Sequence, residues 1–81
     1  MEERTKLLVA LGAATAANCI PCFEYLYCEA GVAGLTPAEI HEAVDLASKI
    51  KLGAHIALKN SIKYIMGQEK AYEEPCSRQF C

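Results

Sequence analysis

Leu35-Thr36-Pro37-Ala38-Glu39 is the stretch that marks most clearly where a helix begins. Thr is a preferred N-cap, Pro is favoured at the first helical position, and a Glu three residues after the cap completes a capping box. The residues that follow repeat apolar side chains at helical spacing, on an inward face expected to comprise Ile40, Ala43, Val44, Ala47 and Ile50. An amphipathic helix is therefore predicted from Pro37 onward.

Two further helices are predicted before this stretch. No Pro interrupts residues 3–17, which favours a first helix, and Asn18 is expected to break or cap it. A second helix is predicted over about residues 19–30, because Pro21 is tolerated in a first turn. The apolar stripe expected on this second helix consists of Ile20, Phe23, Leu26, Tyr27 and Ala30.

Helical spacing continues beyond the helix that begins at Pro37. A break near Gly53 would separate a fourth segment, which ends at Gly67. The polar residues 68–81 then read as a C-terminal tail. The fold class predicted from the sequence is all-α, with about four helices in one small domain over residues 1–67.

Composition excludes several classes of function. The 81 residues carry ten acidic and eight basic side chains, a net charge of −2, so no basic field exists to hold nucleic acid. The longest apolar run, residues 7–14, is shorter than a membrane span. The first residues lack a signal-peptide cleavage site, so a cytoplasmic protein is expected. Because the first helix is apolar on nearly every face, it is expected to pack against copies of itself in a homo-oligomer.

Cysteine is unusually frequent, with five residues in the chain. Cys19-Ile20-Pro21-Cys22 forms a C-x-x-C motif at a predicted helix start, where three-residue spacing brings both sulfurs to one face. The N–H groups and the dipole of a helix N-terminus stabilise a thiolate, which lowers the pKa of the thiol. Two buried core cysteines or a zinc site are the alternatives. The single motif, without a second ligand pair, favours a redox dithiol over zinc.

The dithiol and the downstream sequence Gly34-Leu35-Thr36-Pro37-Ala38-Glu39-Ile40 together resemble the alkylhydroperoxidase D-like, carboxymuconolactone decarboxylase superfamily. The resemblance covers about residues 7–58 and implies an all-helical, oligomeric protein, commonly a hexamer built as a trimer of dimers. Members that carry the dithiol act as peroxidases or thiol-disulfide oxidoreductases, often serving a peroxiredoxin, whereas the decarboxylases typically lack it. Cys19 and Cys22 therefore point to the redox branch.

The sequence departs from the family's proton relay at both ends. In the family's peroxidases a His stands four residues after the second Cys and relays a proton toward a Glu in the preceding helix. Here Leu26 occupies the place of the His, and the place of the Glu falls near Leu7. Thiol-disulfide exchange is therefore expected over efficient peroxide reduction, because exchange expels a thiolate and needs no proton donor for a leaving hydroxide.

The two cysteines are assigned different roles. The family assigns peroxide attack to the second cysteine and partner exchange to the more exposed first. Since Cys19 lies nearest the helix N-terminus, we expect it to be the attacking nucleophile and Cys22 to be the resolving thiol. The expected substrates are a protein or small-molecule disulfide or a hydroperoxide, with a peroxiredoxin-type partner and no cofactor.

Other residues are weaker candidates. His55 and Glu24 are possible auxiliary residues, although for His55 a hydrogen-bonded structural histidine is the favoured interpretation. Glu24 lies two residues from Cys22 and is expected to point elsewhere on the helix. Roles for Cys28, Cys76 and Cys81 stay open. Two other functions also stay open: a non-redox, decarboxylase-like enzyme, and a non-enzymatic metal-binding or oligomeric protein.

Overall fold

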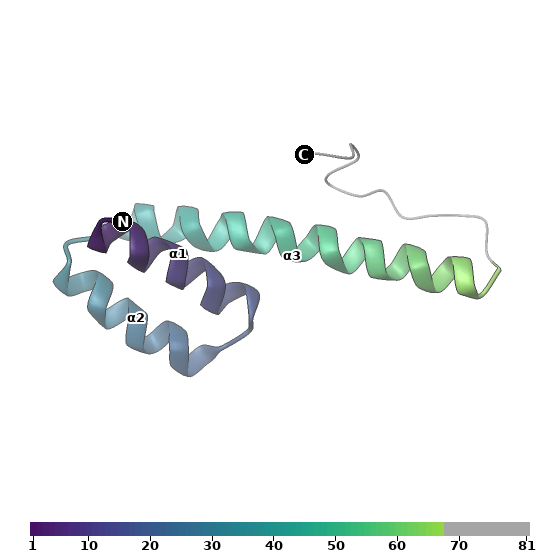
Figure 1. The fold of residues 1–81 in the computed structure, drawn as a ribbon, viewed down its shortest axis with the longest axis horizontal. Helices are drawn as coiled ribbons and strands as arrows, with labels where there is room; N and C mark the ends of the chain where they lie inside the picture. Colours follow the sequence, from purple (N-terminus) through teal and green to yellow (C-terminus); the bar gives the residue numbers. More distant parts are fainter. Residues whose placement is uncertain (68–81) are drawn as a thin grey trace. The chain divides into compact units, whose positions relative to one another are not determined.

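The computed structural model describes residues 1–67, and over this range the chain is all-helical, as predicted. It forms three helices, α1 (Glu3–Ala16), α2 (Ile20–Val32) and α3 (Pro37–Ile65), drawn in Figure 1. The chain divides into two compact units, Met1–Ser48 and Lys49–Cys81, whose boundary falls within α3. The predicted tail, residues 68–81, lies outside the described residues.

Helix α1 ends in a Schellman motif that the sequence signals only through Asn18. This residue has φ of 58°, the left-handed conformation that Asn tolerates better than most residues. The N–H of Asn18 donates to the carbonyl of Thr15, and the N–H of Cys19 donates to the carbonyl of Ala14 at 3.0 Å. The expected cap at Asn18 is confirmed, and the turn delivers Cys19 to the start of α2.

Helix α2 also ends in a Schellman motif, which leads into the connection to α3. Gly34 adopts φ of 81°, and the N–H of Leu35 donates to the carbonyl of Ala30. The predicted capping box follows directly. The N–H of Glu39 donates to Oγ1 of Thr36, while the N–H of Thr36 donates to the carboxylate of Glu39 at 2.9 Å. Helix α3 begins at Pro37, as the sequence predicts.

The expected fourth helix is not confirmed. Helix α3 runs without interruption for 29 residues and passes through Gly53. A single Gly in a helix interior costs only about 1 kcal/mol relative to Ala, and no Pro or capping residue accompanies Gly53 to end the hydrogen-bond ladder. Gly67, with φ of 75°, follows the end of the helix.

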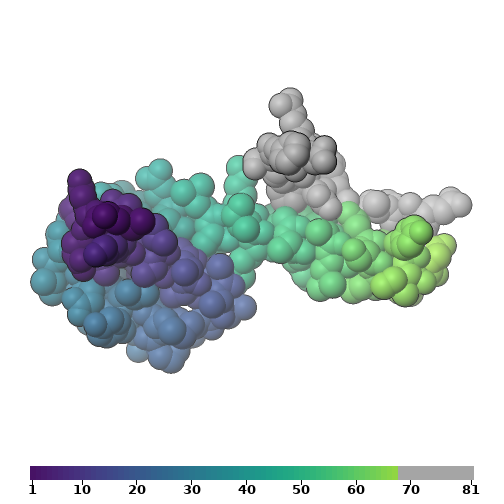
Figure 2. Space-filling view, viewed as in Figure 1, coloured from purple at the N-terminus to yellow at the C-terminus, as the bar shows by residue number. Residues whose placement is uncertain are grey.

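The core of the unit Met1–Ser48 forms where α1, α2 and the first turns of α3 meet. Leu11 is fully buried, and Leu8, Phe23, Leu26, Ala33 and Val44 pack around the core partly exposed. In the space-filling view the purple atoms of α1 and the blue atoms of α2 lie in contact (Figure 2). The cluster of buried side chains consists of Leu7, Leu11, Ala30, Leu35 and Ile40.

Three residues predicted to face inward are exposed instead. Ile20 and Tyr27 are 69% and 53% exposed on α2, and Ile50 is 73% exposed on α3. The core-facing side of α2 is narrower than its apolar stripe, because Phe23, Leu26 and Ala30 already fill the contact with the core. Ile50 lies beyond Ser48, where the first unit ends.

Gly12 lies in α1 where a second helix approaches closely. The structure gives it a role within one chain. A Cβ placed on Gly12 would lie 3.7 Å from the carbonyl oxygen of Ala43 and 4.0 Å from Cβ of Ala47. The close approach is therefore between α1 and α3 inside the unit Met1–Ser48.

Within residues 1–67, none of the three helices combines the length and the apolar character that crossing a membrane requires.

Candidate redox site

Cys19 occupies the junction between α1 and α2 and belongs to both helix ends. Its backbone N–H closes the Schellman motif of α1 by donating to Ala14, and its carbonyl accepts the N–H of Phe23 at 3.0 Å in the first turn of α2. Cys19 is the N-cap of α2 and has extended backbone angles, as N-caps do. The position of this cysteine is therefore fixed by backbone hydrogen bonds on both sides.

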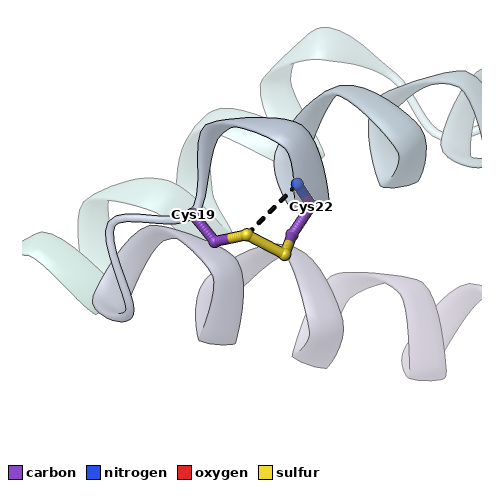
Figure 3. Close-up of a disulfide and its surroundings, with 2 residues drawn as sticks. All are labelled: Cys19 and Cys22. Atoms are coloured by element: carbon purple, nitrogen blue, oxygen red, sulfur yellow. Dashed lines mark hydrogen bonds between the residues drawn. A yellow bond between two sulfur atoms is a disulfide. The ribbon is translucent and has the colours of Figure 1, made fainter.

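Cys19 and Cys22 form a disulfide across the first turn of α2, with their Cα atoms 5.2 Å apart (Figure 3). This separation lies within the range that disulfides span. The backbone N–H of Cys22 donates to Sγ of Cys19 at 3.3 Å, shown by the dashed line in Figure 3. The juxtaposition of the two sulfurs that the motif predicts is present.

The two sulfurs differ in their surroundings. Cys22 is exposed, whereas Cys19 is half-buried. Sγ of Cys19 accepts the N–H that a Ser or Asp oxygen accepts at an ordinary N-cap. When the disulfide is reduced, that N–H and the positive end of the helix dipole favour a thiolate on Cys19. The disulfide therefore joins Cys19, whose sulfur lies where a thiolate is stabilised after reduction, to Cys22, which is exposed to solvent.

Leu7 and Leu26, which the predicted resemblance compares with a proton relay, lie in or against the core. Leu7 is 7% exposed and belongs to the buried cluster, and Leu26 packs against that cluster. Neither side chain has a group that transfers a proton. Both side chains therefore serve the packing of α1 against α2.

The weaker candidates are divided between α2, which carries Glu24 and Cys28, and α3, which carries His55. Glu24 is exposed on α2 and stands 2 residues after Cys22, which places it on another side of the helix. His55 is exposed on α3 in the unit Lys49–Cys81. Cys28 is a free, exposed thiol on α2. Cys76 and Cys81 lie outside the described residues.

Aromatic side chains lie near the dithiol on α2. Tyr25, one turn after Cys22, is 66% exposed. Phe23 and Tyr27 stack with their ring centroids 6.2 Å apart, which joins a partly buried ring to an exposed one. Tyr25 and Tyr27 therefore leave aromatic surface of α2 exposed.

An open hollow of about 460 Å³ lies elsewhere on the unit Met1–Ser48, between α1 and α3. Neither cysteine of the disulfide lines it. The hollow is mostly apolar, and its lining residues are Leu8, Val9, Gly12, Glu39, Glu42, Ala43 and Leu46.

Within residues 1–67, no three His, Cys, Asp or Glu side chains gather in a way that could hold a metal ion. No family model matches the chain, and no curated protein and no solved structure matches it either. What sequence reasoning missed is the hydrogen bond from Cys22 to the sulfur of Cys19, which the N-cap preference for side-chain acceptors could have indicated.

Proposed function

We propose that this protein is a thiol-disulfide oxidoreductase of the alkylhydroperoxidase D-like type, which acts through Cys19 and Cys22. The observation that carries the proposal is the disulfide at the N-terminus of α2, in which an N-cap sulfur accepts a backbone N–H. A bond between two core cysteines would serve stability alone. Here one of the two sulfurs is exposed and the other is held where an anion is stabilised.

The proposed reaction moves two electrons from the dithiol to a substrate disulfide. The thiolate of Cys19 attacks one substrate sulfur, which forms a mixed disulfide and releases the other substrate sulfur as a thiolate. Cys22, as its thiolate, then attacks Sγ of Cys19, closes the intramolecular disulfide and releases the second substrate thiolate. Both released thiolates take protons from water. Each cysteine is oxidised by one electron, and the substrate disulfide is reduced to two thiols.

The substrate class follows from the same geometry. A protein or small-molecule disulfide needs only an accessible sulfur, whereas a hydroperoxide also needs a proton for its leaving oxygen. Because Leu7 and Leu26 fill the relay positions, a hydroperoxide is expected to be a poor substrate. A peroxiredoxin-type disulfide fits the proposed role as a protein substrate.

We also propose that the protein works as a closed homo-oligomer, with a hexamer as the expected form. Several large apolar side chains are exposed on the chain, which is unfavourable unless another surface covers them. On α1, Val9 is 59% exposed, and on α3, Ile50 and Ile65 are 73% and 81% exposed. Packing between copies would remove this surface from water.

Cysteine variants test the proposed activity. Cys19→Ser and Cys22→Ser are each expected to lose nearly all turnover in an assay that couples reduction of a small disulfide to a dithiol reductant. Cys28→Ser is the matched control, because this exposed thiol lies in the same helix and forms no disulfide. It is expected to keep wild-type turnover. Retained turnover in both dithiol variants would overturn the proposal.

Alkylation of the reduced protein tests the role of Cys19. At pH 7 and limiting iodoacetamide, Cys19 is expected to react about tenfold faster than Cys28, because only a thiolate attacks and the helix N-terminus stabilises one on Cys19. Mass spectrometry of the modified peptides measures both rates. Equal rates at the two positions would remove Cys19 as the activated nucleophile.

A further inference from the structure

We infer that the two half-reactions use different sulfurs: the thiol that re-reduces the oxidised protein attacks Cys22 and expels Cys19 as the leaving thiolate. This inference rests on the proposed redox function. It specifies which sulfur of the disulfide the thiol of the electron donor attacks. It assigns Cys22 as the residue that forms the mixed disulfide with the donor, whereas Cys19 forms it with the substrate.

Access favours Cys22 as the attacked sulfur. A thiolate attacks a disulfide from the side opposite the leaving sulfur, so the attacked atom must be open to the solvent. Cys22 is exposed on α2, and its neighbour one turn on, Tyr25, is 66% exposed. Cys19 is half-buried at the junction, where its N–H is bonded to Ala14. Of the two cysteines, Cys22 is therefore the more open to an incoming thiol.

The stability of the leaving thiolate also favours attack on Cys22 with Cys19 as the leaving group. Exchange is faster when the departing sulfur is the better stabilised thiolate. Sγ of Cys19 already accepts the N–H of Cys22 at 3.3 Å and lies at the positive end of the α2 dipole. Cys22 stands three residues further into the helix, and no hydrogen bond to its sulfur is among the described contacts. When the disulfide breaks with Cys19 as the leaving group, the negative charge of the thiolate forms on Sγ of Cys19, where the backbone N–H stabilises it.

The donor thiolate forms a bond to Sγ of Cys22, the bond between the two cysteines breaks, and its electron pair stays on Cys19. A dithiol donor then uses its second thiolate to attack its own first sulfur, and Cys22 leaves as a thiolate that takes a proton. The donor ends as a disulfide and the protein as a dithiol. The Cys19 thiolate formed in this way is the nucleophile that begins the next cycle.

Mapping the mixed disulfide tests the inference. The full chain with Cys28→Ser, Cys76→Ser and Cys81→Ser keeps only the dithiol, and its helical content is compared with wild type by circular dichroism. The oxidised protein is mixed with glutathione and quenched in acid at successive times, and fragment mass spectrometry locates the adduct. At the earliest times, glutathione on Cys22 is expected to exceed glutathione on Cys19 by about tenfold. Wild-type protein is mapped in parallel.

Two results would overturn the inference, and they differ in meaning. An early adduct on Cys19, or equal adducts on both cysteines, contradicts the assigned direction and leaves the redox function standing. A disulfide that neither glutathione nor dithiothreitol opens contradicts the redox function itself, and the inference falls with it.

Discussion

The guanidinium of Arg4 in α1 pairs with the carboxylate of Glu39 in α3 at 2.6 Å, across 35 positions of sequence. Arg4 also donates to the carbonyl of Gly34 at 3.1 Å. One side chain thus ties the first turn of α1 to the turn after α2 and to the first turn of α3. The ion pair therefore links α1 to the start of α3, next to the capping box of Thr36 and Glu39.

Glu39→Gln is expected to lower the midpoint of thermal unfolding by a few degrees at pH 7. The backbone N–H of Thr36, followed by Arg4, lowers the pKa of Glu39 from its ordinary value of 4.5. A depressed folded-state pKa stabilises the fold above the unfolded pKa, and this stabilisation is lost as pH falls through the folded pKa. Gln still accepts hydrogen bonds in a capping box, so the variant isolates the charge.

Thermal unfolding of both proteins from pH 7 to pH 2 measures this effect. The difference between wild type and variant is expected to shrink below about pH 4.5 and to vanish once the wild-type carboxylate is protonated. A difference that is independent of pH would show that the charge of Glu39 does not stabilise the fold.

Two glycine substitutions are expected to have opposite effects. Gly12→Ala should be neutral or stabilise the fold by about 0.4–1 kcal/mol, because the new methyl group fits and the unfolded chain loses freedom. The nearest atom to that Cβ lies 3.7 Å away. Gly34→Ala should destabilise by about 1 kcal/mol or more, since φ of 81° is strained for Ala. Urea unfolding compares the two, and equal effects would contradict the described backbone.

Leu26→His is expected to raise hydroperoxide turnover above that of wild type by about tenfold or more, because it supplies a proton donor one turn after Cys22. A cost in stability accompanies the gain, since Leu26 packs against the core. Tyr25→His is the matched control, because Tyr25 is exposed one turn after Cys22 but does not occupy the relay position. Unchanged turnover in a folded Leu26→His variant would show that the proton comes from another source.

Light scattering at micromolar concentration tests assembly. The expected mass is a multiple of 8.8 kDa, with six copies as the proposed form. Ile50→Lys should shift the distribution toward smaller species, because Ile50 is 73% exposed and proposed to be covered by another copy. A wild-type mass of one chain would refute the oligomer.

Local chemistry explains why parts of the fold were predictable from the sequence. Thr36, Pro37 and Glu39 carry their own capping box, and Asn18 carries the left-handed conformation that ends α1. These signals act over a few residues and need no tertiary context. The juxtaposition of Cys19 and Cys22 was predictable for the same reason, because their spacing fits one helical turn.

What could not be predicted depends on distant parts of the chain. Whether α3 continues through Gly53 depends on a balance of about 1 kcal/mol that local sequence does not settle. The exposure of Ile20 and Ile50 depends on how much of each helix the core covers, and helical periodicity carries no such information. The pairing of Arg4 with Glu39 joins residues that no short-range pattern relates.

The most direct test of the dithiol function is the reduction potential of the Cys19–Cys22 pair. The full chain with its other three cysteines replaced by Ser is equilibrated in thiol-disulfide buffers, and its free thiols are counted after acid quench. Exchange-competent pairs of this kind have midpoints of about −270 to −120 mV, and we predict one two-electron transition in that range. A pair that stays oxidised below about −300 mV would be a structural disulfide and would contradict the proposed function.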